Sequence, residues 1–152
     1  RENLDELTLT EVEPVFDVAN ILRSNNDILY LLSNTGNRLG AQWLQNFLGS
    51  EYRVHILENM YSYSHLDSTM ALLREGLCLL NPDRVNEDNM PEFLIIGLRI
   101  SDVPLVICDE NQKELHKELY KHNIEVIPMK LRHSRTLGGS FHCTTLDIWR
   151  SE

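Results

Sequence analysis

Short apolar runs alternate with one-sided helical patterns in the first part of this chain. Residues 15–18, 27–32 and 52–57 are rich in apolar and β-branched side chains, which predicts three strands. Between the last two runs, apolar residues recur at helical spacing over residues 39–48, and Gly49 is typical of the residue that follows a helix. This part of the chain therefore predicts the order β, β, α, β.

The remaining pattern repeats this order with different spacing. Residues 65–73 and 77–80 predict a β-hairpin whose turn lies at residues 74–76. Further strands are predicted over residues 93–100, 105–108, 124–129 and 141–149. The recurring ββαβ order favours a mixed α/β fold built of stacked modules.

One helix in the second half has its own end signals. Residues 109–122 carry apolar residues on one side and pairs of glutamate and lysine on the other. Asp109 and Gln112 have the spacing of a capping box, and Asn123 is a residue that tolerates a left-handed stop. These signals predict a helix from Asp109 to His122.

Composition favours a soluble globular protein and excludes several classes of partner. The 152 residues suffice for one domain with one core, and 42% of them are hydrophobic. The net charge of −9 argues against a nucleic-acid surface, which needs clustered lysine and arginine. Apolar runs are too short to cross a membrane, and no leader sequence is visible.

The three cysteines predict a reducing compartment, and we expect the protein to be cytoplasmic. An odd and sparse set is not a disulfide framework. Cys78 and Cys108 lie in apolar runs and are expected to be inert buried thiols. Cys143 differs because its neighbours are polar or glycine. The six histidines show no spacing suited to zinc, so no metal is expected.

Cys143 is the first residue that could carry chemistry. A cysteine thiolate is a strong nucleophile when cations or backbone amides stabilise it. Gly138 and Gly139 precede it and permit backbone conformations that other residues forbid. Taken alone, the same residues are more typical of a glycine turn that leads into a strand with one buried cysteine.

His65 and Asp67 form the second candidate. In a strand, residues two apart point to the same face, so an imidazole and a carboxylate would share one wall of a pocket. A histidine at that place can pass protons near neutral pH. The alternative is the solvated side of a half-buried strand.

Asp17 and Arg84 complete the set. Asp17, after Glu13 and Pro14, can accept hydrogen bonds from a planar guanidinium, and Arg84 in the Asn81–Arg84 turn can bind a carboxylate. Without further context, each is also typical of an ordinary surface loop.

Taken together and in order, these segments resemble the amidinotransferases of the glycine and inosamine-phosphate type. That family carries the patterns E-P-x-F-D-A-A-D, H-x-D-A/T-T, N-P-D-R and L-G-G-G-F-H-C-x-T-x-D-x-R-R, and the chain has a counterpart of each at residues 13–20, 65–69, 81–84 and 137–150. Residues 37–43 and 52–56 resemble its N-x-L-G-x-x-W and Y-R-V-H-I patterns. Arginine and agmatine deiminases share only a looser H-x-D/E and G-G-x-x-x-C pattern.

The resemblance implies a fold, a reaction and a set of roles. The fold is an α/β propeller of five modules, the pentein fold, of which this chain would form part. Cys143 would be the nucleophile, His65 the general acid and base, and Asp17 the residue that holds the guanidinium and orients His65. Asp67 would bind the guanidinium and Arg84 a substrate carboxylate. The amidino group of L-arginine would pass through Cys143 to an acceptor amine with release of ornithine, without a cofactor or metal.

Some residues depart from the family pattern. Ser140 replaces a glycine, Asn20 replaces an acid, and Trp149 replaces an arginine. The stretch after Arg84 is shorter than in the family, and the chain begins near the middle of a family member. We therefore expect residues 1–152 to be the C-terminal part of a single catalytic domain that is incomplete here.

Two other functions stay open on the sequence. One is a guanidine hydrolase of the arginine or agmatine deiminase type, in which water replaces the acceptor amine. The other is a remnant that keeps the fold without the activity. A papain-like protease is disfavoured because its cysteine precedes its histidine. The acceptor amine is open, and a homodimer is compatible with the resemblance, since family members are often dimers.

Overall fold

The structure divides into two compact units. It is a computed structural model in which residues 13–60, 65–74, 77–85 and 105–145 are described. The first unit comprises residues 1–101 and the second residues 102–152. The described sheets are small, with three strands in one and two in each of the others, so the fold is α/β with small sheets.

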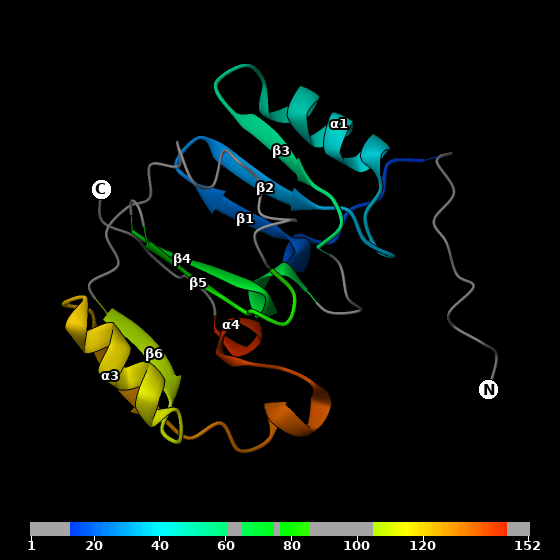
Figure 1. Ribbon diagram of the computed structural model, residues 1–152. Coiled ribbons are helices and arrows are strands. Elements are labelled where there is room, and N and C mark those ends of the chain that lie inside the picture. The colour runs from blue at the N-terminus through cyan, green and yellow to red at the C-terminus, as the bar shows by residue number, and fades with distance from the viewer. Residues whose placement is uncertain (1–12, 61–64, 75–76, 86–104, 146–152) are drawn as a thin grey trace. The chain divides into compact units, whose positions relative to one another are not determined.

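A three-stranded sheet forms the centre of the first unit (Figure 1). β1 (Ile21–Ser24) pairs antiparallel with β2 (Asp27–Leu31), and β2 pairs in parallel with β3 (Arg53–Leu57). The β1–β2 hairpin has a turn of two residues, in which Asn25 adopts a left-handed φ of 52°. The observed order is β, β, α, β, as predicted.

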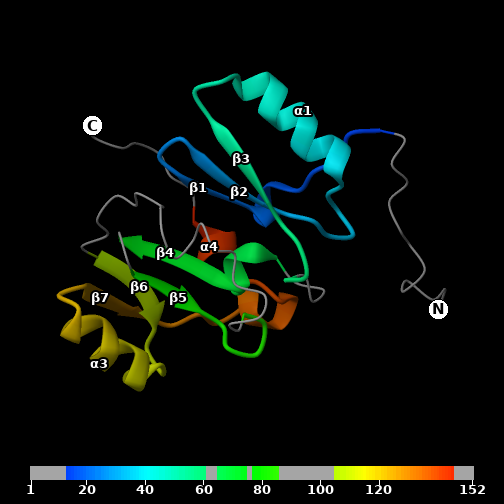
Figure 2. The ribbon, with the colours of Figure 1, turned by 45° about the horizontal axis from the view of Figure 1, so that its top comes forward.

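Helix α1 (Arg38–Leu48) makes the crossover between the parallel strands β2 and β3. Figures 1 and 2 show it lying along β3, with which it is in contact. Asn37 caps its first turn by accepting a hydrogen bond from the Gly40 amide at 2.8 Å. Gly49 follows it with a φ of 76°, so the predicted end of the helix is confirmed.

The second sheet of this unit is the predicted hairpin of β4 (Met70–Arg74) and β5 (Leu77–Leu80). The core consists of Leu29, Leu31, Leu57, Met60, Leu66, Met70 and Val85. It therefore joins β2 and β3 to the hairpin. Leu66 is fully buried in this core, so the residue next to it in sequence, His65, is anchored by apolar packing.

The second unit contains a parallel pair of strands joined by a helix. β6 (Leu105–Asp109) pairs with β7 (Glu125–Met129), and α3 (Lys113–Lys121) packs against β7 (Figure 2). The short helix α4 (Phe141–Thr144) follows. The strands over 105–108 and 124–129 are confirmed, and Asn123 has the predicted left-handed φ, at 58°.

Several local predictions were wrong. Residues 15–18 form no strand, because Val15 bonds to Asn37: its amide donates to Asn37 Oδ1 and its carbonyl accepts from the Asn37 amide. The strand lies later, at β1, which the sequence analysis did not identify. The N-cap of α3 is Gln112, and Asp109 instead ends β6 and accepts a hydrogen bond from the Asn111 amide.

Two predicted strands near the candidate residues were also wrong at their starts. Residues 66–68 form a 3-10 turn before β4, and residues 141–144 form α4. The predictions for residues 75–76, 93–100 and 146–149 lie outside the described residues.

Candidate functional site

Asp17 is held by the start of a 3-10 turn, Val18–Asn20. Its Oδ1 accepts a hydrogen bond from the Ala19 amide at 3.0 Å, which caps the turn. Its Oδ2 accepts one from Thr35 Oγ1, also at 3.0 Å. Both carboxylate oxygens therefore have a fixed donor, and the plane of the carboxylate is set.

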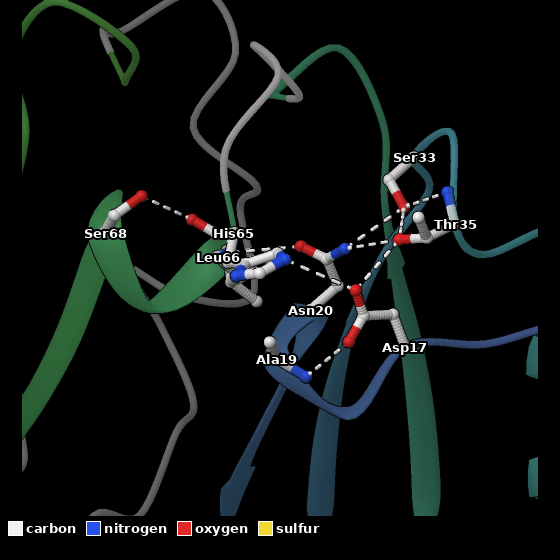
Figure 3. A network of polar contacts seen from close by, with 8 residues as sticks. All are labelled: Asp17, Ala19, Asn20, Ser33, Thr35, His65, Leu66 and Ser68. Atoms are coloured by element: carbon white, nitrogen blue, oxygen red, sulfur yellow. Dashed lines mark hydrogen bonds and ion pairs between the residues drawn. The ribbon is translucent and has the colours of Figure 1, made fainter. Parts of the chain in front are cut away.

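His65 faces this carboxylate. Its Nε2 lies 3.3 Å from Asp17 Oδ2, and the two side chains are 49% and 28% exposed (Figure 3). The two atoms are within ion-pair distance, and a hydrogen bond between them would need a hydrogen on Nε2, because an ionised carboxylate can only accept. The pair places an imidazole against a carboxylate and leaves both side chains partly open to solvent.

A 3-10 turn, not a strand, holds His65. The turn Leu66–Ser68 begins directly after it, and the His65 carbonyl accepts hydrogen bonds from the amide and the hydroxyl of Ser68, at 3.2 and 2.7 Å. His65 and Asp67 therefore do not share one face of a strand, and that prediction was wrong. Asp67 lies in the same turn as a half-buried side chain.

Asn20 connects the two halves of this arrangement. Its side chain is buried, with 2% of the residue exposed. Its Oδ1 accepts a hydrogen bond from the Leu66 amide at 3.1 Å, and its Nδ2 donates to Ser33 Oγ at 3.1 Å and Thr35 Oγ1 at 3.3 Å (Figure 3). In the sequence, Asn20 stands out only as a departure from a pattern, and no local pattern points to Thr35.

Arg84 lies at the same end of the β4–β5 hairpin as His65. Antiparallel pairing sets the residues before β4 beside those after β5, and the Asn81 amide donates to the Thr69 carbonyl at 2.9 Å. The Arg84 amide closes the following turn on the Asn81 carbonyl at 3.0 Å, and its side-chain Nη1 is buried. Four predicted residues of the first unit, Asp17, His65, Asp67 and Arg84, thus come from neighbouring turns, and Asp17 and His65 are in contact.

Cys143 belongs to the second unit. It lies in α4, is exposed, and has Ser140 Oγ 3.9 Å from its sulfur. Gly138 has a φ of 79°, a left-handed conformation that favours glycine. A Cβ at Gly139 would lie 3.3 Å from the Ser134 Cβ, so this glycine permits a tight turn before α4.

The other two thiols have a different environment. Cys108 is buried and Cys78 half-buried, and burial raises the pKa of both thiols because a thiolate is poorly solvated there. The predicted burial is confirmed for Cys108, whereas Cys78 is only half-buried. Of the three cysteines, Cys143 is the one that is exposed to a reagent.

Within the described part of the chain, no group of three or more histidine, cysteine or acidic side chains is arranged to hold a metal ion. None of the described helices has the length and apolar character needed to span a bilayer.

Several known proteins are similar in sequence to this chain over most of its length. No family model matches the chain. It is 46% identical over 170 residues to inosamine-phosphate amidinotransferase 1 of Streptomyces glaucescens, covering 94% of the chain and 49% of that protein. It is 32% identical to the mitochondrial glycine amidinotransferase of Xenopus laevis, covering 97% of the chain and 41% of that protein. It is 31% identical to the L-arginine:L-lysine amidinotransferase of Pseudomonas savastanoi pv. phaseolicola, covering 95% of the chain and 47% of that protein.

A solved structure of an amidinotransferase is also similar to this chain. An inosamine-phosphate amidinotransferase from Streptomyces griseus matches with a TM-score of 0.84 and 43% identity, over 95% of the chain and 49% of that structure. A dimethylarginine dimethylaminohydrolase matches with a TM-score of 0.64 over 88% of the chain and 58% of that structure. The sequence identity is 18%, so this match shows a similar fold alone. The chain spans about half the length of the curated relatives it matches.

Proposed function

This chain belongs to the amidinotransferase family, of whose curated members it spans about half the length, and on that basis we propose that the whole protein transfers the amidino group of L-arginine to an acceptor amine. The observation that carries the proposal is the contact between His65 Nε2 and Asp17 Oδ2 at 3.3 Å. Such an oriented imidazole suits a reaction in which a nitrogen must gain a proton as it leaves.

In the first half-reaction, the Cys143 thiolate attacks the guanidinium carbon of arginine. A carbon–sulfur bond forms, and the bond from that carbon to the arginine Nε breaks. The departing nitrogen takes a proton from His65 and leaves as the amine of ornithine. An amidino group remains covalently bound to Cys143.

In the second half-reaction, an acceptor amine attacks the same carbon. It gives up a proton to His65, and the carbon–sulfur bond breaks to return the Cys143 thiolate. Because both half-reactions use one covalent intermediate, the proposal predicts ping-pong kinetics.

The remaining site residues hold the substrate. Asp17 and Asp67 pair with the planar guanidinium, which is a poor electrophile unless its charge is held in place. Arg84 pairs with a substrate carboxylate, for which a guanidinium has matching bidentate geometry. The turns that carry these side chains are neighbours in the first unit, which supports their action on one substrate.

The same reasoning extends to the whole protein. We propose that residues 1–152 are part of one catalytic domain whose complete form is a propeller of five α/β modules. The small sheets and the likeness to amidinotransferase structures support this architecture. The three cysteines suit a reducing compartment such as the cytoplasm. A homodimer is compatible with this assignment.

Product analysis tests the proposed reaction. The full-length protein is incubated with L-arginine and, in parallel, with glycine, lysine or an inosamine phosphate as acceptor. We expect ornithine to appear in proportion to the amidinated acceptor, and the Cys143→Ser variant to form neither. Citrulline and ammonia without ornithine would instead identify a hydrolase, and no product from a folded protein would identify a remnant.

A further inference from the structure

We propose that Asn20 and Thr35 are positioning residues that orient Asp17 and His65 toward each other, an inference that rests on the proposed function. Neither residue needs to contact a substrate for this role. They belong to a closed ring of contacts that includes both members of the pair (Figure 3).

The ring can be followed atom by atom. From His65 it passes along the backbone to the Leu66 amide, which donates to Asn20 Oδ1 at 3.1 Å. Asn20 Nδ2 donates to Thr35 Oγ1 at 3.3 Å. Thr35 Oγ1 donates to Asp17 Oδ2 at 3.0 Å, and this oxygen lies 3.3 Å from His65 Nε2.

Donor and acceptor chemistry fixes the orientation of the Asn20 amide. The Leu66 amide can only donate, so it fixes the Asn20 oxygen on its side and turns the NH₂ group toward the hydroxyls of Ser33 and Thr35. Thr35 Oγ1 then accepts from Asn20 and keeps its own proton for Asp17.

Burial gives this arrangement its stiffness. Asn20 is only 2% exposed, and a buried polar side chain that lost its partners would be costly, so its three hydrogen bonds are strongly favoured. Through Thr35 it determines which Asp17 oxygen receives a hydroxyl proton. Through Leu66 it fixes the backbone beside His65. One residue therefore sets the position of both members of the pair.

Steady-state kinetics of the full-length protein test the proposal with Thr35→Val, which keeps the shape of the side chain but removes the hydroxyl. We expect kcat to fall by about tenfold or more, because a misplaced proton donor slows the chemical step, while the KM for arginine changes little. Thr35→Ser restores the hydroxyl and should recover most of kcat. Ser33→Ala removes another partner of Asn20 but leaves the bond from Thr35 to Asp17, so its loss should be smaller.

Asn20→Leu tests the amide directly. It removes the acceptor for Leu66 and both donor contacts to Ser33 and Thr35, so we expect it to lose kcat at least as strongly as Thr35→Val. Thermal unfolding is measured for every variant. If folded Thr35→Val keeps the kcat of the unchanged protein, or if Thr35→Ser is as slow as Thr35→Val, the proposal is overturned.

A measurement without substrate separates this inference from the proposed reaction. Long-range ¹H–¹⁵N NMR reports which imidazole nitrogen of His65 carries hydrogen. The unchanged protein should carry it on Nε2, facing Asp17, and Thr35→Val should show a mixture of tautomers. This result would support the positioning role even if no ornithine were released. An unchanged His65 spectrum in Thr35→Val would contradict it.

Discussion

At the scale of single residues, the chain offers two aspartate–histidine pairs with different surroundings. Asp17 and His65 lie 3.3 Å apart between turns, and both are partly open to solvent. Asp27 and His55 lie 2.6 Å apart between the paired strands β2 and β3, and the Asp27 side chain is only 9% exposed. The first pair is accessible to a substrate, whereas the second is part of the sheet.

This contrast supplies a matched pair of variants. Asp17→Asn should lower kcat by about a hundredfold, because an amide no longer holds His65 with a charged acceptor during proton transfer. Asp27→Asn should leave kcat within about twofold, because it alters a buried pair outside the proposed site. Steady-state kinetics with L-arginine measure both. Equal losses in the two variants would show that the effect is general destabilisation.

Asp27 should also make stability depend on pH. Burial alone would raise the pKa of its carboxyl, but the hydrogen bonds and charges of His55 and Arg53 outweigh burial and hold the pKa below its ordinary value of 3.8. A lowered pKa in the folded protein means that the unfolded chain binds the proton more readily. The stabilisation is therefore present above about pH 4 and is lost as the pH falls through the folded value.

Urea unfolding at several pH values checks this expectation. Asp27→Asn should be less stable than the unchanged protein by about 1 to 2 kcal/mol at pH 7, and the difference should shrink on acidification below pH 4. Glu51→Gln, a change at an exposed residue, serves as the control and should have little effect. A constant difference between pH 7 and pH 3 would contradict the assigned cause.

Sequence alone identified some of these residues and not others. Asp17 and His65 were singled out because each belongs to a recognisable local motif. Asn20 was noted only as a departure, and Thr35 was not noted. Their roles depend on the bond from the Leu66 amide to Asn20, which joins residues 46 apart, and no local pattern encodes such a contact.

At the scale of elements, the segment that carries Asp17 is fixed by the start of α1. Asn37 accepts from the Val15 and Gly40 amides, and Tyr30 Oη donates to the Val15 carbonyl at 3.0 Å. A Cβ at Gly40 would lie only 2.2 Å from that carbonyl oxygen. Gly40 therefore permits the chain before Asp17 to approach the helix closely.

Gly40→Ala should consequently lower both the stability of the protein and its kcat. In an open helix, this change favours folding by about 1 kcal/mol, but here the new methyl group meets backbone that cannot rotate away. We expect a loss of about 1 to 3 kcal/mol in the free energy of unfolding and a lower kcat as Asp17 shifts. Chemical denaturation and kinetics measure the two effects.

Gln42→Ala is the control for this prediction, since Gln42 is exposed on the same helix. It should be neutral or slightly stabilising. If Gly40→Ala proved as stable as Gln42→Ala, the close approach of Val15 to α1 would be refuted.

The elements also show where periodicity predicts well and where it fails. The strand β2 is buried along its whole length, so its continuous apolar run is a strong pattern. The turn Leu66–Ser68 has a single buried apolar residue, which fits a strand or a turn equally well. Its hydrogen bond to Asn20 selects the turn, and that partner lies far away in the sequence.

At the scale of the whole molecule, the proposed reaction draws on both compact units. Asp17 and His65 belong to the first, and Cys143 belongs to the second. The relatives share the chain over about half of their own length, so the complete protein is the form in which the reaction must be tested. The proposed transfer depends on Cys143, which carries the amidino group between donor and acceptor.

An intact-mass spectrum of the full-length protein after incubation with L-arginine alone detects this covalent intermediate. We expect a covalent amidino adduct that maps to Cys143, is absent from Cys143→Ser, and forms together with an equal amount of ornithine. A folded protein that releases citrulline without ornithine, or that forms neither an adduct nor a product, would refute the proposed role of Cys143.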